Sequence, residues 1–463
     1  MSRARHSPLT DAERFPLLTE TGRARLQALR EHPSAPRYNH PCGEQLTANG
    51  LTTVRAFETA LTTAPRGWRH GETPAWVNEF AAKCLAEVPF YRQRGGAASD
   101  FFALRPTTRD DLAREPWAFV PDGQPTDELV VYDTSGASGE PMLVLSHPAT
   151  SASYLPALRW ALAKVGVTLK GGAGVSVALV SAHRRTFTYA TVSSYLDEAG
   201  CLKISLHPDE WRTPEDRVKF LDECAPEVYT GDPVAFMALA ELPLKHRPKA
   251  LVSSAFALLP GLKRELEAHF NCPVLDVYSM NETRFIAVKT EIGWEIAPPD
   301  LYVEILDDAG HPCAPGARGE ITLTGGRNPF LPLLRYRTGD FAALEFSAEV
   351  PVLVNFTGRP PVFFVAVDGR VVPGLDVNNS LRQFPLAQFA LRQRSDHSLT
   401  LQVLGRNVDT DAIAAAIRQL FGASQALEIT LLPADFAGKL MPFASEISEI
   451  NLAANRVRFA ETA

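Results

Sequence analysis

Residues 249–282, KALVSSAFALLPGLKRELEAHFNCPVLDVYSMNE, contain the pattern that decides the fold. The short apolar run KALVSSA (249–255) predicts a strand. PGLKRELEAHF (260–270) starts with proline and carries apolar residues at helical spacing, so it predicts a helix. CPVLDVY (272–278) predicts a second strand. Strands separated by helices of about 10–15 residues are typical of βαβ units and a mostly parallel sheet.

The same alternation continues on both sides of this stretch. Towards the N-terminus, GAGVSVALVS (172–181) and CLKISLH (201–207) predict strands, and YATVSSYLDEAG (189–200) between them predicts a helix. After Asp300 the pattern changes to alternating segments that predict a smaller β-rich subdomain: YVEIL, GEITLT and LLRYRTGD. The tail then predicts strand, helix and strand in SLTLQVLG, TDAIAAAIRQLFG and QALEITLL.

These elements predict an α/β fold with three parts. Residues 1–75 form a polar, proline-broken N-terminal cap segment. Residues 76–357 form a large domain with mostly parallel sheets and the β-rich subdomain. Residues 358–463 form a small α+β C-terminal domain, expected to be mobile.

The composition excludes several classes of protein. The chain has 463 residues, 45% of them hydrophobic and 21% charged, with a formal net charge of -7. That balance argues against a nucleic-acid coat or a membrane-surface binder, because both favour a basic face. The six cysteines show no metal-site spacing, and no signal peptide or membrane-spanning run is visible. We therefore expect a cytoplasmic protein that engages neither nucleic acid nor membrane.

The loop TSGASGEP (134–141) directly follows a predicted strand. Backbone N–H groups in a glycine-rich turn converge on an anion, and serine and threonine hydroxyls add donors. The loop matches neither the P-loop nor the dinucleotide fingerprint. Taken alone, it is equally compatible with a flexible surface turn.

Further motifs decide between these readings, because they occur in a fixed order. The loop resembles the T-S-G-[ST]-[ST]-G-x-P phosphate signature of the adenylate-forming acyl ligases. DVYSMNE (276–282) resembles their D-x-Y-G-x-[ST]-E, and YRTGD (336–340) matches their ribose signature. The remaining matches are similar to the phenylacetate–CoA ligase branch: EVPFY, RPTTRDDL, PEVYTGDPVAFMALAEL and LPLLR. The resemblance extends from about residue 85 to the C-terminus.

This resemblance implies binding roles for ATP and Mg²⁺. The β- and γ-phosphates would lie on the loop residues Thr134, Ser135, Gly136, Ser138 and Gly139. Asp340 would accept both ribose hydroxyls, because a carboxylate has two acceptor oxygens. Glu282 would face Mg²⁺, which prefers hard oxygen ligands. The other implied nucleotide contacts are Asp276, Tyr278, Asn281 and Arg359.

The resemblance also implies how the acid is handled. Lys439, in LLPADFAGKLMPF, would swing in with the C-terminal domain and offset charge that develops on the carboxylate and the α-phosphate. Candidate walls of the acyl pocket are His183, Phe187, Tyr189 and Phe256. Aromatic walls favour an aromatic or similarly apolar acid, but these residues are equally good core residues.

The sequence departs from the family pattern at several positions. Ala137 removes a hydroxyl from the phosphate loop, and Glu140 places an acid beside it. Ser279 replaces a glycine and Asn281 replaces a serine or threonine. At the expected hinge, Gly358-Arg359 is followed by Pro360-Pro361, and proline restricts both its own φ and the preceding residue. Adenylation is therefore better supported than the subsequent transfer.

The sequence thus predicts an ATP-dependent ligase that converts a small carboxylic acid to an acyl-adenylate with release of pyrophosphate. CoA is the implied acceptor, while an acyl carrier protein or an amine is left open, as is a homodimer. The alternative is a nucleotide-binding homologue that has lost catalysis. Retention of YRTGD, Glu282 and Lys439 favours the enzyme.

Overall fold

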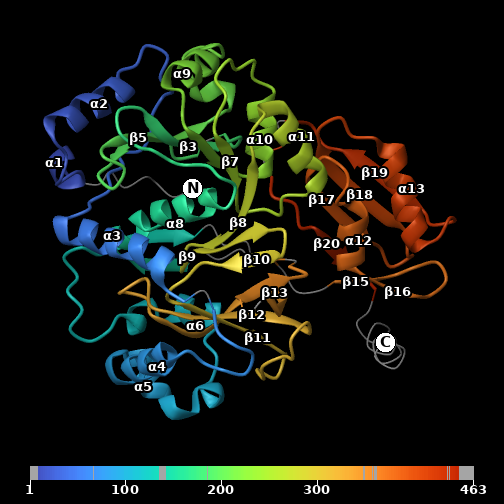
Figure 1. The fold of residues 1–463 in the computed structure, drawn as a ribbon. Helices are drawn as coiled ribbons and strands as arrows, with labels where there is room; N and C mark the ends of the chain where they lie inside the picture. Colours follow the sequence, from blue (N-terminus) through green and yellow to red (C-terminus); the bar gives the residue numbers. More distant parts are fainter. Residues whose placement is uncertain are drawn as a thin grey trace.

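The computed structural model describes residues 9–65, 67–134, 142–184, 186–347, 350–356, 358, 362–434, 436 and 438–447. Its centre is a 12-stranded mixed sheet in the order β11-β12-β13-β14-β10-β9-β8-β7-β6-β3-β5-β4 (Figure 1). The bounds of these strands are β3 Val175–Ser181, β4 Tyr189–Ser193, β5 Ala199–Ser205, β6 Val228–Gly231, β7 Ala250–Ser253, β8 Val274–Met280, β9 Arg284–Thr290, β10 Gly293–Ile296, β11 Leu301–Leu306, β12 Arg318–Gly325, β13 Leu333–Ser347 and β14 Val350–Val354. The fold is α/β, as predicted.

Strands β8, β7, β6, β3 and β5 are parallel and form one half of this sheet. Helices cover both faces: α9 (Asp216–Cys224), α10 (Pro233–Ala240) and α11 (Pro260–Phe270) lie on one face, and α3 (Ala48–Thr63) and α8 (Tyr154–Ala163) on the other (Figure 1). All four residues of β6 and of β7 are buried. Strands buried on both faces read as apolar runs, which explains why the sequence pattern identified them.

The predicted helix at residues 189–200 was wrong. Tyr189–Ser193 forms the edge strand β4, antiparallel to β5, and a turn follows it. The β-branched residues Thr191 and Val192 favour a strand here. The strand and the turn after it both bury apolar side chains, and together these residues give a spacing that resembles the period of a helix.

Antiparallel strands from β9 to β14 extend the sheet into the predicted β-rich part. A separate hairpin, β1 (Val130–Thr134) and β2 (Met142–Ser146), lies outside the large sheet. The remaining helices of the N-terminal 170 residues are α1 Asp11–Arg14, α2 Glu20–Arg30, α4 Ala75–Glu87, α5 Pro89–Arg94, η1 Ala98–Ala103, α6 Arg109–Arg114, η2 Pro116–Phe119 and α7 Pro148–Ala152; a short turn, η3 (Pro208–Glu210), follows β5.

The C-terminal region has its own four-stranded sheet, in the order β19-β18-β17-β20. Its elements are β15 Phe363–Val365, β16 Val371–Pro373, α12 Gly374–Leu381, β17 Leu386–Gln393, β18 Leu399–Gly405, α13 Thr410–Phe421, β19 Leu427–Leu431 and β20 Phe443–Ser445. Ile413, Ile417 and Phe421 lie one turn apart on α13 and are fully buried against this sheet. The domain boundaries at residues 75 and 357 stay a prediction.

The C-terminal region packs beside α10 and α11 (Figure 1). Gly261 at the start of α11 donates its N–H to the Arg382 carbonyl, and an added Cβ would lie 2.2 Å from the Phe384 carbonyl oxygen. A glycine is therefore required for this close approach. Within the described ranges, no helix is both long and apolar enough to cross a membrane.

Candidate active site

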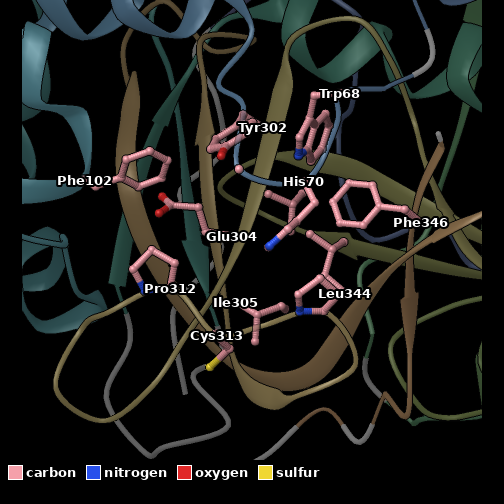
Figure 2. Close-up of a pocket in the computed structure, with 13 residues that line it drawn as sticks. Trp68, His70, Phe102, Tyr302, Glu304, Ile305, Pro312, Cys313, Leu344 and Phe346 are labelled. Carbon is pink, nitrogen blue, oxygen red and sulfur yellow. The ribbon is translucent and has the colours of Figure 1, made fainter.

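An apolar cavity of about 230 Å³ in the β-rich part contains none of the predicted site residues. Trp68, His70 and Phe346 gather on one side of it, and Phe102 lies near Glu304 on the other (Figure 2). Glu304 is buried, and its two carboxylate oxygens accept from Arg335 Nη2 at 3.0 Å and Nε at 3.1 Å. Because the acid is already paired and buried, this cavity offers no reactive group for acid activation.

Three of the predicted site residues lie instead at the carboxyl ends of the parallel strands. His183 follows β3, Phe256 follows β7 and Glu282 follows β8, and Asp232, which was not predicted, follows β6. Since these strands are parallel and adjacent, their carboxyl ends share one edge of the sheet, where open α/β sheets bind ligands. The topology thus brings segments up to 100 residues apart in sequence to one edge.

Glu282 is 3% exposed and has two polar partners. The Tyr336 hydroxyl of β13 donates to Oε1 at 3.1 Å, and Arg109 Nη1 lies 3.4 Å from the same oxygen. Burial, followed by the Glu282 carboxylate, raises the pKa of Tyr336 well above its ordinary value. Tyr336 therefore stays protonated and serves as a donor.

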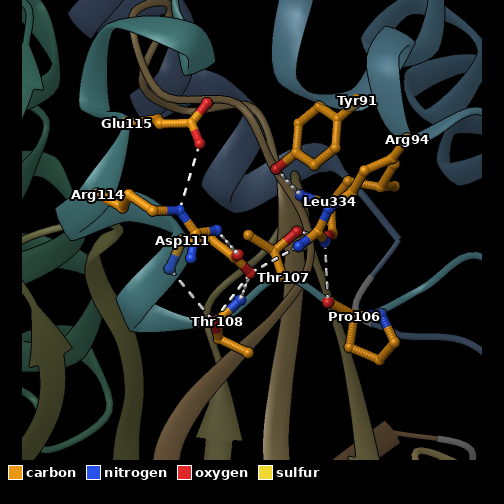
Figure 3. A network of polar contacts seen from close by, with 9 residues as sticks. All are labelled: Tyr91, Arg94, Pro106, Thr107, Thr108, Asp111, Arg114, Glu115 and Leu334. Atoms are coloured by element: carbon orange, nitrogen blue, oxygen red, sulfur yellow. Dashed lines mark hydrogen bonds and ion pairs between the residues drawn. The ribbon is translucent and has the colours of Figure 1, made fainter.

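Arg109 was not assigned a role from the sequence, although RPTTRDDL contains it. Thr107 anchors this segment to β13: its N–H donates to the Arg335 carbonyl at 2.9 Å and its hydroxyl to the Leu334 carbonyl at 2.8 Å. Thr108 and Asp111 then form a capping box that starts α6 at Arg109. Figure 3 shows Thr108 and Asp111 of this capping box. Asp111 also pairs with Arg94 and Arg114, at 2.8 Å each. The motif fixes where Arg109 begins its helix.

Asp340 lies next to Tyr278, whose hydroxyl donates to Oδ2 at 2.8 Å. The Tyr278 ring packs edge-on against Phe356 with centroids 4.8 Å apart. Gly339 before Asp340 has a φ of 80°, which favours glycine. A Cβ added to Gly358 would lie 3.6 Å from Asp340 Oδ1, so the expected hinge begins beside this carboxylate.

Lys439 reaches the same edge from the C-terminal region. Its Nζ lies 4.9 Å from the centroid of the Phe256 ring. The buried side-chain amide of Gln388 in β17 holds the flanking residues: Nε2 donates to the Gly438 carbonyl at 3.2 Å, and Oε1 accepts from the Leu440 N–H at 2.8 Å. A Cβ on Gly438 would meet the Phe436 ring at 2.4 Å. The glycine in the G-K pair is thus a steric requirement.

Comparisons with known proteins show which proteins the whole chain is similar to. The chain is 24% identical over 313 residues to phenylacetate-coenzyme A ligase of Pseudomonas putida, covering 62% of this chain and 69% of that protein. It is 22% identical over 293 residues to the protein CapK of Staphylococcus aureus, covering 59% of this chain and 62% of that protein. No family model matches.

Among solved structures, a 2-hydroxyisobutyryl-CoA ligase in complex with an acyl-AMP matches with a TM-score of 0.59 at 19% identity, covering 83% of this chain and 90% of that one. In sequence and in fold, the chain is thus similar to phenylacetate–CoA ligase-like members of the adenylate-forming ligases. The predicted enzyme class, an AMP-forming ligase, is confirmed with it.

For this adenylate-forming ligase, several of the predicted nucleotide contacts can be examined individually. Ser279, which replaces a glycine, is not among the residues with positive φ, so the substitution strains no backbone. Asn281 is exposed beside it. Asp276 is 5% exposed, and burial raises its pKa to about 7, against the opposing effects of Lys289 and the Leu258 N–H. Their roles towards ATP stay predictions.

Other predicted residues of the ligase lie outside the described residues. These are Ser135, Gly136, Ser138, Gly139 and Arg359, together with Ala137, Glu140, Pro360 and Pro361. Thr134 closes β1 and leads into this loop.

The four predicted acyl-pocket residues fall into separate groups. Phe256 lies beside Lys439, whereas Phe187 packs against His40 of the N-terminal segment, with ring centroids 4.8 Å apart. The Tyr189 ring centroid is 6.1 Å from that of His40. His183 lies near Asp232 at the carboxyl ends of β3 and β6. Among the described residues, no ring contact joins Phe256 to Phe187 or Tyr189.

Glu282 is suited to a hydrated Mg²⁺, although the described residues contain no cluster of three His, Cys, Asp or Glu side chains. Magnesium in nucleotide sites commonly takes one or two carboxylates and keeps several waters. Thr283 Oγ1, next in sequence, is buried and has no hydrogen-bond partner among the described residues. One carboxylate and one unsatisfied hydroxyl therefore fit this demand.

Proposed function

We propose that this protein activates a carboxylic acid with ATP and transfers the acyl group to CoA. The observation that carries the proposal is the convergence of Tyr278, Glu282 and Asp340 at one region of the sheet while Lys439 comes to Phe256 from the C-terminal region. Packing of the hydrophobic core does not by itself explain why a lysine of the C-terminal region lies at this edge of the large sheet.

In the first step, a carboxylate oxygen of the acid attacks the α-phosphorus of ATP. A P–O bond to the β-phosphate breaks, and pyrophosphate leaves with its electron pair. Lys439 offsets the negative charge that builds up between the two anionic reactants. The Phe256 ring beneath its ammonium group excludes water on one side, which strengthens that interaction.

Asp340 is the acceptor for the ribose hydroxyls of ATP. Tyr278 donates to Oδ2, and a carboxylate has two oxygens with about four lone-pair directions, which is the acceptor capacity that two ribose hydroxyls require. Glu282 would hold Mg²⁺, which would neutralise phosphate charge when bound. Arg109 orients this buried carboxylate through its ion pair.

In the second step, the CoA thiol, as its thiolate, attacks the acyl carbon and AMP leaves. CoA is supported as acceptor by the ligase of Pseudomonas putida and by a structure of 2-hydroxyisobutyryl-CoA ligase with 2-HIB-AMP and CoA, which has a TM-score of 0.51 at 19% identity. We propose an aromatic or apolar acid, because Phe256 presents a flat apolar surface beside Lys439.

Acid-dependent ATP–pyrophosphate exchange tests this function. Wild type and Lys439→Ala are compared over a panel of aryl, fatty and amino acids, first without CoA and then with it. We expect one class of acid to drive exchange, the variant to lose it, and CoA to trigger release of AMP. Absence of exchange with every acid, despite ATP binding, would refute the proposal in favour of a non-catalytic nucleotide-binding protein.

A further inference from the structure

A groove of about 800 Å³ lies between the N-terminal segment and the edge strand β4. Its walls come from α1, the end of α2, residues 36–41 and the start of β4. Helices α1 and α2 flank the large sheet on the side of β5 (Figure 1). Of the residues given a role under the proposed function, none lines this groove, although Tyr189, a predicted wall of the acyl pocket, does.

The groove is strongly basic, although the whole chain has a net charge of -7. Four arginines line it, and Asp11 is the one acid among its described lining residues. Asp11 is shared by Arg14 at 3.3 Å and Arg30 at 2.6 Å. Hydrogen bonding to Arg30 is the main cause that lowers the pKa of Asp11. The acid is thus ionised, yet its single negative charge balances only a quarter of the charge of the four arginines.

The other two arginines are Arg37 and Arg212, and both are exposed. Arg212 Nη1 donates to the Pro33 carbonyl at 3.1 Å. Within the part of the chain that the structure describes, neither guanidinium pairs with a carboxylate. Guanidinium groups without a carboxylate partner can bind the oxygens of a phosphate group through paired N–H donors.

Lys203 adds to this positive charge, and the His40 ring beside it stays uncharged near neutral pH because its pKa is lowered. Lys203 of β5 lies directly opposite Tyr189, a lining residue, in the β4–β5 ladder. It is partly buried, and the pKa of its ammonium group is lowered by that burial. Burial, Lys203 and Arg14 together lower the pKa of His40. His40 Nδ1 is buried and has no hydrogen-bond partner among the described residues.

Aromatic rings stand beside these cations. Phe187 is 47% exposed and packs on the His40 ring with centroids 4.8 Å apart, while Tyr38 and Tyr189 line the groove itself. An exposed ring beside a cluster of cations provides stacking area for a planar heterocycle together with charge for its phosphates. That combination matches a nucleoside phosphate better than a bare anion.

The groove lies at the same edge of the sheet as the proposed site. Tyr189 begins β4 opposite Lys203, close to the carboxyl end of β5, and β5 runs parallel to β3. Four strand spacings separate β4 from β7, which Phe256 follows, and this corresponds to about 19 Å across the sheet. The groove is therefore a separate site on the same edge.

We propose that this groove is a second, separate binding site for a nucleoside phosphate that carries at least two phosphate groups. Arg37 and Arg212 hold the phosphates, and Phe187 stacks on the base. Two ligands share this chemistry: the nucleotide end of CoA and a free adenine nucleotide.

Titration calorimetry with 3′,5′-ADP tests this site without relying on turnover. The protein is the Asp340→Ala variant of the full chain, so that the proposed ATP site is disabled. We expect saturable binding, weakened about tenfold or more in Arg37→Gln/Arg212→Gln, since two charge-assisted contacts are lost. The matched control Arg92→Gln/Arg370→Gln removes the same charge from two exposed arginines outside the groove and should leave the affinity unchanged.

Further titrations identify the ligand. If CoA binds more tightly than ADP or ATP, the natural ligand of the groove is the nucleotide end of CoA. If ADP or ATP binds more tightly than CoA, the natural ligand is a free nucleotide. Pyrophosphate that binds as tightly as 3′,5′-ADP would refute the stacking contact. Equal affinities in the groove and control variants would overturn the site itself. None of these results depends on whether acid-dependent exchange is observed, so failure of the groove and failure of the proposed activity remain distinguishable.

Discussion

The strongest test of how Lys439 is positioned is the substitution Gln388→Ala. Gln388 is 6% exposed, and its amide makes the two hydrogen bonds that hold Gly438 and Leu440 on either side of Lys439. At about 1 kcal/mol for each hydrogen bond, the ordered position of the lysine loses about 2 kcal/mol. If that order is needed only in the adenylation transition state, the exchange rate at saturating ATP falls by about 30-fold.

The chain contains a matched control for this experiment in the same strand. Gln393 in β17 is fully buried, and its amide similarly accepts from the Val365 N–H at 2.8 Å and donates to the Val365 carbonyl at 2.7 Å. Gln393→Ala should therefore cost a similar free energy of unfolding without releasing the segment around Lys439.

Both variants are assayed by ATP–pyrophosphate exchange and by thermal unfolding. We expect similar losses of stability, but a selective loss of exchange rate in Gln388→Ala with little change in the KM for ATP. Gln388→Glu retains one acceptor for the Leu440 N–H and should fall between wild type and Gln388→Ala. Equal losses of exchange in Gln388→Ala and Gln393→Ala would refute positioning and leave only a contribution to stability.

Three further predictions concern buried charges. Asp276 keeps its proton to a pH of about 7 when folded and loses it near 3.8 when unfolded. The free energy of unfolding therefore falls by up to about 4 kcal/mol as the pH rises through this window. Asp276→Asn should remove that part of the pH dependence, which is measured by denaturant unfolding at pH 5 and pH 8. Arg109→Ala strands the buried Glu282 carboxylate and should cost about 2 kcal/mol, and adding Glu282→Gln should recover most of it in a double-mutant cycle of melting curves. Arg335→Leu should lower the free energy of unfolding by about 3–5 kcal/mol, whereas Arg335→Leu/Glu304→Leu should be much less destabilised; a double variant as unstable as the single one would contradict the pairing argument.

The parallel half of the sheet was predictable because its strands are buried on both faces and are separated by helices with clear starting signals. Asp232, for example, caps α10 through the Ala235 N–H, and Pro233 follows it. Edge strand β4 was missed, since an edge strand beside a turn buries side chains without a clean period of two. Local spacing cannot reveal which neighbour covers a strand's outer side.

The candidate site was also predictable only in part. Residues inside contiguous motifs, such as Asp340 in YRTGD, were identified because a local backbone requirement, Gly339 with positive φ, leaves a signature. Arg109 carried no such signal, because its importance comes from a contact with Glu282 across 173 positions of sequence. Phe187 and Tyr189 were assigned to the acyl pocket by position in the chain, whereas the sheet edge directs them towards His40.

The contacts that seat the C-terminal region explain how Lys439 could be both well placed and removable. Arg406 pairs with Glu241 at 3.0 Å and lies 3.6 Å from Glu265, and Asn407 donates to Glu265 at 3.1 Å. Partly exposed ion pairs of this kind contribute about 0–1 kcal/mol each. The clamp from Gln388 lies inside the C-terminal sheet and would travel with the lysine. These ion pairs therefore add little to docking, while the geometry of the lysine within its own segment stays fixed. A lysine that is needed for adenylation but not for the transfer step requires this combination.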